Sequence, residues 1–304
     1  MTRKPAVGID LGGTKIHAGV VAPGGETLGE VRVPTEPDKE TDVVVGNMVA
    51  AARQAMEKAG LGQEDIDGVG LGSPAPLDIK AGILISPNNL PSLHGCPIVE
   101  RLTEELGIPV TLDNDANCLG LAEARFGAGR GAEVCCGLTL GTGMGAFMVI
   151  RGEVYGGPHG AGVEIWCSPH QGDFVEEKVS GRGIARTYFK LTEREASARE
   201  LADMAREGDA QAIETWQEFA RNTAVSVAWL SNTGDPDVFV LGGSIAKAWD
   251  LFGETLVREA RKYINEVTRN ALRIVPAELG DAAGMLGAAA LVLQPDPADF
   301  LPNE

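Results

Sequence analysis

The sequence predicts an α/β protein made of two related domains. Short apolar strands alternate with helical stretches such as residues 41–59, where apolar side chains recur at helical spacing and Gly60 follows as a stop signal. Two hairpins with glycine-rich turns, near residues 7–20 and 137–150, stand at matching places along the chain. The chain has 304 residues, which is enough for two domains of ordinary size.

The first hairpin has a turn that is nearly bare of side chains. An apolar strand runs into Asp10, and a second apolar strand follows the turn residues, which are Gly12, Gly13, Thr14 and Lys15. Glycines let backbone N–H groups face an anion, and an acid at a strand end can hold the water of a metal ion. The same pattern is equally typical of an ordinary tight hairpin, so this motif alone decides nothing.

The second hairpin repeats this design. Residues 137–143 share three of seven positions with residues 8–14, and both segments are followed by an alternating apolar strand and another turn. A repeat of this kind indicates a duplicated structural unit. Two such hairpins facing each other across a cleft could hold a chain of phosphates from both sides.

The other elements follow in order. In the first half we expect strands at 27–33, 69–71 and 110–112 and helices at 98–106 and 116–126. In the second half, apolar residues line one face of a long helix through 213–230, and further helices are expected around 256–264 and over 282–293. A buried strand at 238–241 turns through Gly242 and Gly243 into a helix. That junction suits close approach of a nucleotide, although a packing turn has the same sequence.

An acidic cluster follows the strand at 110–112. Asp113, Asn114 and Asp115 stand where that strand ends and the next helix begins. A carboxylate held at such a rigid place can orient an acceptor hydroxyl and take its proton during phosphoryl transfer. The alternative is that the cluster only caps the helix, and we expect Asp113 or Asn114 to do so.

Composition narrows the functional classes. The formal net charge of −17 disfavours nucleic acid and anionic membranes as partners, because their phosphates would be repelled. No apolar signal segment and no membrane-spanning run is present, so a cytoplasmic location is expected. The five cysteines form no CxxC pair, which indicates reduced core thiols, with Cys167 as the one to watch.

Taken together, the motifs resemble those of the ROK family of bacterial sugar kinases and sugar-responsive repressors, a branch of the actin/hexokinase/Hsp70 ATPase fold. The matching segments occur in family order over nearly the whole chain, at 10–15, 86–90, 114–117, 140–143, 179–182, 241–244 and 279–281 with 287–288. The resemblance implies a two-domain actin-like ATPase (ribonuclease H-like) fold with a nucleotide cleft between the domains. We expect a small domain at 1–118, joined by a C-terminal helix at 286–304, and a large domain at 119–285.

The resemblance also implies a magnesium-dependent kinase that transfers the γ-phosphoryl group of ATP to a hexose, at the 6-hydroxyl of glucose or a close relative. Its phosphate-binding residues would be Gly12, Gly13, Thr14, Lys15, Gly141, Thr142 and Gly143. Gly242 and Gly243 would approach the adenosine, and Asp10 would hold Mg²⁺ through water. The sugar would be bound by Asn89, Asn114, Asp115, Glu164 and Glu176. Asp115 would be the catalytic base, and the enzyme would be a homodimer.

The zinc cluster of many ROK kinases is missing. A tetrahedral site needs four ligands, and only Cys167 and His170 remain as candidates, so no structural zinc is expected. The chain is more similar to the zinc-free branch of polyphosphate- or ATP-dependent glucokinases and glucomannokinases. Glu164, Glu176 and Ser180 fall on the pattern of that branch without a gap.

One departure concerns the sugar pocket. Trp166 and Cys167 stand where the family has Gly-His, whose histidine contacts the sugar. His170 or His159 could replace it, although a lone loop histidine is more often incidental. Trp166 is either core filler or an aromatic wall of the pocket. The departure keeps two alternatives open, a polyphosphate-using kinase and a weak or inactive sugar-binding regulator. The repressors carry a helix-turn-helix before the ATPase-like body, for which this chain has no room, so such a regulator would act through protein contacts.

Overall fold

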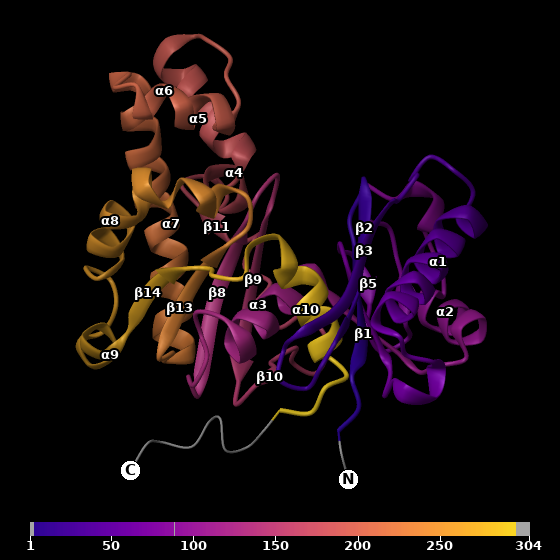
Figure 1. The fold of residues 1–304 in the computed structure, drawn as a ribbon. Helices are drawn as coiled ribbons and strands as arrows, with labels where there is room; N and C mark the ends of the chain where they lie inside the picture. Colours follow the sequence, from indigo (N-terminus) through magenta and orange to yellow (C-terminus); the bar gives the residue numbers. More distant parts are fainter. Residues whose placement is uncertain (1–2, 88, 296–304) are drawn as a thin grey trace. The chain divides into compact units, whose positions relative to one another are not determined.

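The computed structural model describes residues 3–87 and 89–295 of the chain (Figure 1). The chain divides into two compact units. Unit 1 comprises Met1–Arg130, Gly157–Gly160 and Asp281–Glu304, and unit 2 comprises Gly131–Gly156 and Ala161–Gly280. The predicted boundary at 118/119 falls inside helix α3 (Asp115–Phe126), whereas the whole helix belongs to unit 1.

The physical reason is the packing of the C-terminal helix α10 (Ala283–Ala290) on α3. A Cβ atom added to Gly287 of α10 would lie 1.7 Å from the carbonyl oxygen of Cys118 in α3, so the two backbones meet directly. The closing segment therefore joins unit 1 from Asp281 onward. Residues 296–304, part of the predicted helix 286–304, lie outside the described residues.

Unit 1 is built on a five-stranded sheet in the order β3-β2-β1-β4-β7. Strands β1 to β3 are antiparallel, and β1, β4 and β7 are parallel. The strands are β1 (Ala6–Leu11), β2 (Lys15–Val21), β3 (Thr27–Pro34), β4 (Val69–Ser73) and β7 (Val110–Asn114). The other elements are α1 (Thr41–Ala59), α2 (Ile98–Leu106), a small hairpin of β5 (Leu77–Asp78) and β6 (Ile83–Leu84), and the short 3-10 helices η1 (Gln63–Asp65), η2 (Pro91–Leu93) and η4 (Gly280–Ala282).

The two faces of this sheet differ in chemistry. One face, with Val7, Ile9 and Leu11, forms an apolar core with α1 and α2. On the opposite face, a Cβ atom added to Gly8 or Gly70 would lie 2.0 or 1.7 Å from a backbone oxygen of α10, so glycine alone lets that helix approach. Figure 1 shows α1 and α10 on opposite sides of β1. Asp10, two residues after Gly8, shares this glycine-lined face.

Unit 2 repeats the sheet. Its order is β10-β9-β8-β13-β14, with β8 antiparallel to β9 and parallel to β13. The strands are β8 (Val134–Leu140), β9 (Met144–Ile150), β10 (Glu153–Val154), β13 (Val238–Gly242) and β14 (Arg273–Pro276). Each sheet thus has a leading hairpin, a third antiparallel strand on one side and two parallel strands on the other, which confirms the predicted duplication.

The helices of unit 2 enclose a second apolar core. They are α4 (Glu176–Val179), α5 (Gly181–Thr192), α6 (Ala198–Arg206), α7 (Ala210–Gly234), η3 (Ile245–Ala248), α8 (Trp249–Ala260) and α9 (Glu266–Ala271), and β11 (Pro169–His170) pairs with β12 (Asp173–Phe174). The long helix predicted through 213–230 is α7. In its core, the ring of Trp216 stacks on Phe252 of α8 with centroids 5.8 Å apart.

Helix ends follow local sequence signals where glycine stands at the end. α1 and α2 have the predicted bounds, and Gly60 and Gly107 end them in the left-handed conformation with φ of 69° and 67°. The helix predicted around 256–264 begins and ends earlier, since α8 runs from Trp249 to Ala260 and Asn265 already caps α9 through the N–H of Thr268. Ile264 is buried in the core although it lies in the turn after α8, so its helical spacing in the sequence predicted a helix that extends too far.

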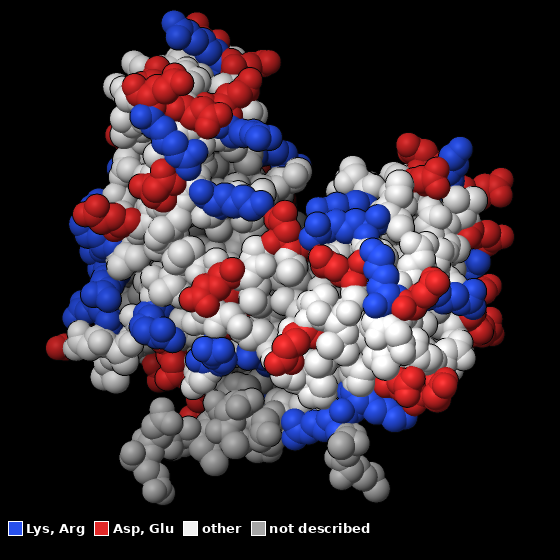
Figure 2. All heavy atoms as spheres, in the orientation of Figure 1, with Lys and Arg blue, Asp and Glu red and all other residues white. Residues whose placement is uncertain are grey.

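Acidic and basic side chains are interspersed over the face drawn in Figure 2. Within residues 3–87 and 89–295, no helix is both long and apolar enough to cross a membrane. Four cysteines are buried thiols, as the sequence predicted, whereas Cys167 is exposed and does not belong to a core. Burial raises the pKa of the Cys136 thiol to about 12, so that thiol stays protonated and unreactive.

Candidate functional site

The turn of the first hairpin is fixed by backbone hydrogen bonds. The N–H of Gly12 donates to the carbonyl of Lys15 at 3.0 Å. Thr35, just after β3, holds the turn from outside, because its hydroxyl donates to the carbonyl of Gly12 at 2.7 Å and its N–H donates to the carbonyl of Thr14 at 3.1 Å. Thr14 and Lys15 are exposed at the tip. Nothing in the sequence pattern pointed to Thr35.

Asn89 lies against this turn. A Cβ atom added to Gly13 would come within 2.9 Å of the Cβ of Asn89, so a larger residue at position 13 would displace the asparagine. The structure therefore brings the predicted sugar ligand Asn89 beside Gly13, one of the predicted phosphate residues. The preceding residue of its motif, Asn88, lies outside the described residues.

Two acids stand in one row at the carboxyl ends of the parallel strands. Asp10 of β1 and Asp113 of β7 both align with Gly72 of β4, which lies between them. Two strand spacings separate their Cα atoms by about 10 Å, and the aligned side chains share a face of the sheet. Burial raises the pKa of Asp10, while the charges of His17 and Lys15 act in the opposite direction. The row therefore places two carboxyl groups, of which that of Asp10 is half-buried, on one face of the sheet.

Asp113 is a structural acid. Its Oδ1 accepts the N–H of Asn114 at 2.7 Å and the side-chain amide of Asn117 at 2.8 Å. Asn114 caps α3, since its side chain accepts the N–H of Ala116 at 2.7 Å, so the capping prediction is confirmed. Asp115 is the first residue of the helix and is exposed, and its Oδ1 lies 2.8 Å from the N–H of Ala116. The three residues of the cluster thus have three roles: Asp113 stabilises the loop, Asn114 caps α3, and Asp115 presents an exposed carboxylate.

Asp113→Asn should stabilise the protein more at neutral than at acidic pH. Burial raises the pKa of Asp113, and its hydrogen bonds to Asn117 and Asn114 only partly offset this. The folded state therefore binds the proton more tightly, so wild-type stability falls as pH rises from about 3.8 through the raised pKa. An asparagine Oδ1 can accept both hydrogen bonds without charge. Urea unfolding at a series of pH values checks this, and a difference independent of pH would contradict it.

The turn of the second hairpin is held by a carboxylate. The N–H of Gly141 donates to the carbonyl of Gly143 at 3.0 Å. The Oε2 of Glu176 accepts the N–H of Met144 at 2.9 Å, and a Cβ atom at Gly143 would lie 2.7 Å from that oxygen. Arg182 of α5 donates to the other carboxylate oxygen at 2.8 Å. Glu176 therefore braces the turn that the sequence assigned to phosphate, and the anchoring role of Arg182 was not foreseen although its segment had been noted.

The glycine turn after β13 lies beside the same hairpin. Gly243 has φ of +85°, and an added Cβ atom would lie 2.3 Å from the carbonyl oxygen of Leu140. The hydroxyl of Ser244 would be 3.6 Å from a Cβ atom at Gly141. Within unit 2, the predicted phosphate residues 141–143 and the predicted adenosine residues Gly242 and Gly243 are therefore neighbours.

A pocket of about 490 Å³ opens next to this turn. It has both apolar and basic lining, from Ala198, Arg199, Ala202, Asp203 and Arg206 of α6, Trp216 of α7, and Ser244, Ile245, Lys247 and Ala248. A volume of this order is typical of small-molecule sites, which are concave, largely apolar and furnished with a few polar groups.

Glu164 and Trp166 form a pair near Glu176. Burial raises the pKa of Glu164, and a hydrogen bond from the Trp166 side chain partly lowers it. The carbonyl of Trp166 accepts the N–H of Glu176 at 3.2 Å. Trp166 is 41% exposed, so it is not the core residue that one of the two interpretations expected.

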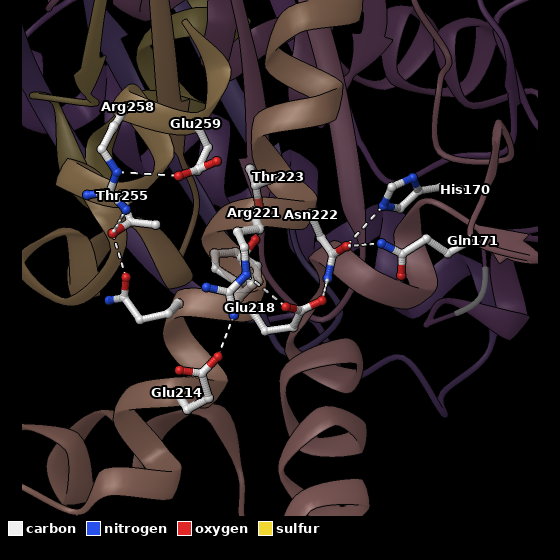
Figure 3. A network of polar contacts seen from close by, with 12 residues as sticks. His170, Gln171, Glu214, Glu218, Arg221, Asn222, Thr223, Thr255, Arg258 and Glu259 are labelled. Atoms are coloured by element: carbon white, nitrogen blue, oxygen red, sulfur yellow. Dashed lines mark hydrogen bonds and ion pairs between the residues drawn. The ribbon is translucent and has the colours of Figure 1, made fainter. Parts of the chain in front are cut away.

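His170 is engaged elsewhere. Its Nε2 lies 3.0 Å from the Oδ1 of Asn222 in α7, which also accepts the amide of Gln171, as Figure 3 shows. Its ring packs edge-on against Trp229. Within the described residues, no three histidine, cysteine or acidic side chains are grouped to hold a metal. His159 belongs to unit 1 and is exposed.

Comparisons with known proteins agree with this architecture. The sequence profile of the ROK family matches residues 6–295. An N-acetyl-D-glucosamine kinase from Photobacterium profundum is 32% identical, and the match covers 93% of this chain and 98% of that protein.

Two crystal structures have the same fold. A ROK hexokinase from Thermus thermophilus superposes with a TM-score of 0.84 at 35% identity, over 94% of this chain and 97% of that one. A ROK family glucokinase from Streptomyces griseus, solved with glucose and AMPPNP, gives 0.77 at 28% identity, over 94% of this chain and 98% of that one. With its two repeated sheets, each led by a glycine-turned hairpin, the chain belongs to the ROK family and has the actin-like ATPase fold of its sugar kinases.

Proposed function

We propose that the protein is an ATP-dependent sugar kinase that transfers the γ-phosphoryl group to a hexose hydroxyl, the 6-hydroxyl of glucose or of a close relative. The observation that carries the proposal is the pair of glycine-turned hairpins on sheets of identical topology, one in each unit, together with the exposed Asp115 at the start of α3. The sugar kinases among the relatives support the reaction class.

The phosphates of ATP are bound mainly by the backbone rather than by side chains. Bare turns at Gly12–Gly13 and Gly141–Gly143 leave room for phosphate oxygens to approach the main chain, and Lys15 adds a positive charge. The 490 Å³ pocket beside Gly243 takes the nucleoside, since its mixed apolar and basic lining suits a base and ribose that lead to phosphates.

The residues next to the first phosphate turn fit a Mg²⁺ ion. This ion keeps several waters and is usually held by one or two carboxylates, so it does not require a group of three protein ligands. Asp10, at the end of β1 and next to the phosphate turn, would hold it through water, and the ion would neutralise charge on the transferred group. Burial raises the pKa of this half-buried carboxyl, and a bound cation would favour its ionised form.

On the acceptor side, Asp115 is the general base. As the first residue of α3 it is fixed by the helix, and its carboxylate is exposed to solvent, from which the substrate arrives. Asn89, Asn114, Glu164 and Glu176 complete the sugar-binding set, with Glu176 also bracing the Gly141–Gly143 turn. As the family resemblance implies, the enzyme is cytoplasmic and homodimeric.

A sugar panel tests the function. ADP release is measured with glucose, mannose, galactose and N-acetylated hexosamines, with ATP or polyphosphate as donor, and with EDTA as the metal control. We expect ATP-dependent turnover with glucose or a close relative, lost in EDTA and restored by excess Mg²⁺. If none of the sugars is phosphorylated with either donor, the proposed kinase function is overturned and the regulator is favoured. The polyphosphate arm separates the two kinds of kinase.

A further inference from the structure

We propose that Trp166 and Phe174 form an aromatic platform for the pyranose ring of the sugar, and that this platform sets hexose specificity. The inference rests on the proposed function and deepens it. The side chains of Trp166 and Phe174 are 41% and 52% exposed. They contact each other edge to face, with centroids 6.1 Å apart and an interplanar angle of 81°. Two exposed aromatic rings in contact form an apolar surface of the kind that lines small-molecule sites.

The platform is held rigidly by the backbone. Phe174 ends the β11–β12 hairpin, in which Pro169 pairs with Phe174. The N–H of Val175 donates to the carbonyl of Ser168 at 2.9 Å, and the N–H of Glu176 donates to the carbonyl of Trp166 at 3.2 Å. Backbone hydrogen bonds therefore connect the segment that carries Trp166 to the segment that carries Phe174. A rigid platform loses little conformational entropy when a ligand docks on it.

One carboxyl group lies beside the Trp166 ring. The Trp166 side chain is hydrogen-bonded to Glu164. Glu176 contacts Trp166 through its backbone N–H, while its carboxylate accepts from Met144 and Arg182. Pyranoses present C–H groups on their faces and hydroxyls at their edges. An aromatic ring covers the apolar face while carboxylates accept hydrogen bonds from the edge. The exposed rings beside the Glu164 carboxyl match that pattern.

The platform predicts which hexoses are accepted. A pyranose whose ring hydroxyls are all equatorial, such as glucose, offers a flat C–H face. An axial hydroxyl on the docking face would hold the sugar ring away from the aromatic surface. That hydroxyl would also lose its hydrogen bonds to water against an apolar surface. The favoured class is thus an all-equatorial hexose or its 2-acetamido derivative, and an epimer with an axial hydroxyl on that face is disfavoured.

The experiment combines Trp166→Ala and Phe174→Ala with the control Phe189→Ala, whose ring is 47% exposed on α5 of the same unit. We expect either platform variant to raise the KM for glucose by about tenfold or more, the scale of one lost aromatic contact. The KM for ATP and the melting temperature should stay close to wild type, and Phe189→Ala should change neither KM. Trp166→Phe keeps a ring without the indole N–H and should retain most of the sugar affinity.

A direct binding readout keeps this inference separate from the kinase activity. Glucose is titrated without nucleotide and followed by tryptophan fluorescence and by calorimetry. Binding that is weakened in both platform variants supports the platform even if no sugar is phosphorylated. Wild-type glucose affinity in both folded variants would overturn it, even if the protein proves to be an active kinase.

Discussion

Asp115→Asn is expected to lower kcat by about 10²- to 10⁴-fold, the usual contribution of a general base. Asp115 is the first residue of α3, where its exposed carboxylate is held while its Oδ1 lies 2.8 Å from the N–H of Ala116. Asparagine keeps the size and one acceptor oxygen, so the helix start is preserved. It cannot take a proton from the acceptor hydroxyl. The chemical step should therefore fail while the sugar still binds.

The measurement pairs steady-state kinetics with glucose titration and thermal unfolding of the same variant. Glu100→Gln is the matched control, because it removes an exposed acid from the first turn of α2 in the same unit. Each substitution removes a favourable interaction with the helix dipole worth about 0.3–1 kcal/mol. Only Asp115→Asn should affect kcat. Full turnover in folded Asp115→Asn protein would rule out the proposed base.

Gly243→Ala should destabilise unit 2 by about 3 kcal/mol, the sum of left-handed backbone strain and overpacking. Gly243 has φ of +85°, and the new methyl group would lie 2.3 Å from the carbonyl oxygen of Leu140, at the end of β8. Relief of that clash requires the glycine turn and the Gly141–Gly143 hairpin to separate. The substitution should therefore raise the KM for ATP by a much larger factor than the KM for sugar. Urea unfolding and kinetics under folding conditions check both effects.

Gly208→Ala separates the two causes. Gly208 has φ of +93°, close to that of Gly243, but an added Cβ atom there meets nothing within 4 Å. It should cost only the backbone strain, about 1 kcal/mol, and leave the KM for ATP unchanged. Equal destabilisation by the two substitutions would show that close packing on Leu140 does not matter, and an unchanged KM for ATP in Gly243→Ala would remove that turn from the donor site.

Local sequence determined the elements and their repetition. Gly60 and Gly107 set two helix ends, because glycine alone adopts the left-handed conformation at no cost. The repeated hairpin motif foretold two sheets of one topology, and the position of Asn114 foretold its cap. These features depend on residues a few positions apart, so the pattern of the chain carries them. Predicted boundaries failed where apolar spacing was the only signal, as at the end of α8.

Tertiary structure alone decided how the site residues meet. The alignment of Asp10 and Asp113 across Gly72 depends on the register of three strands that are distant in sequence. The contact of Glu176 with Met144 joins segments 32 residues apart, and Thr35 contacts Gly12 from the segment just after β3. The sequence showed that Trp166 breaks the family pattern, but only folding decided that its ring is exposed beside Phe174. Burial is fixed by what packs around a side chain, and a residue's own neighbours in sequence do not specify that.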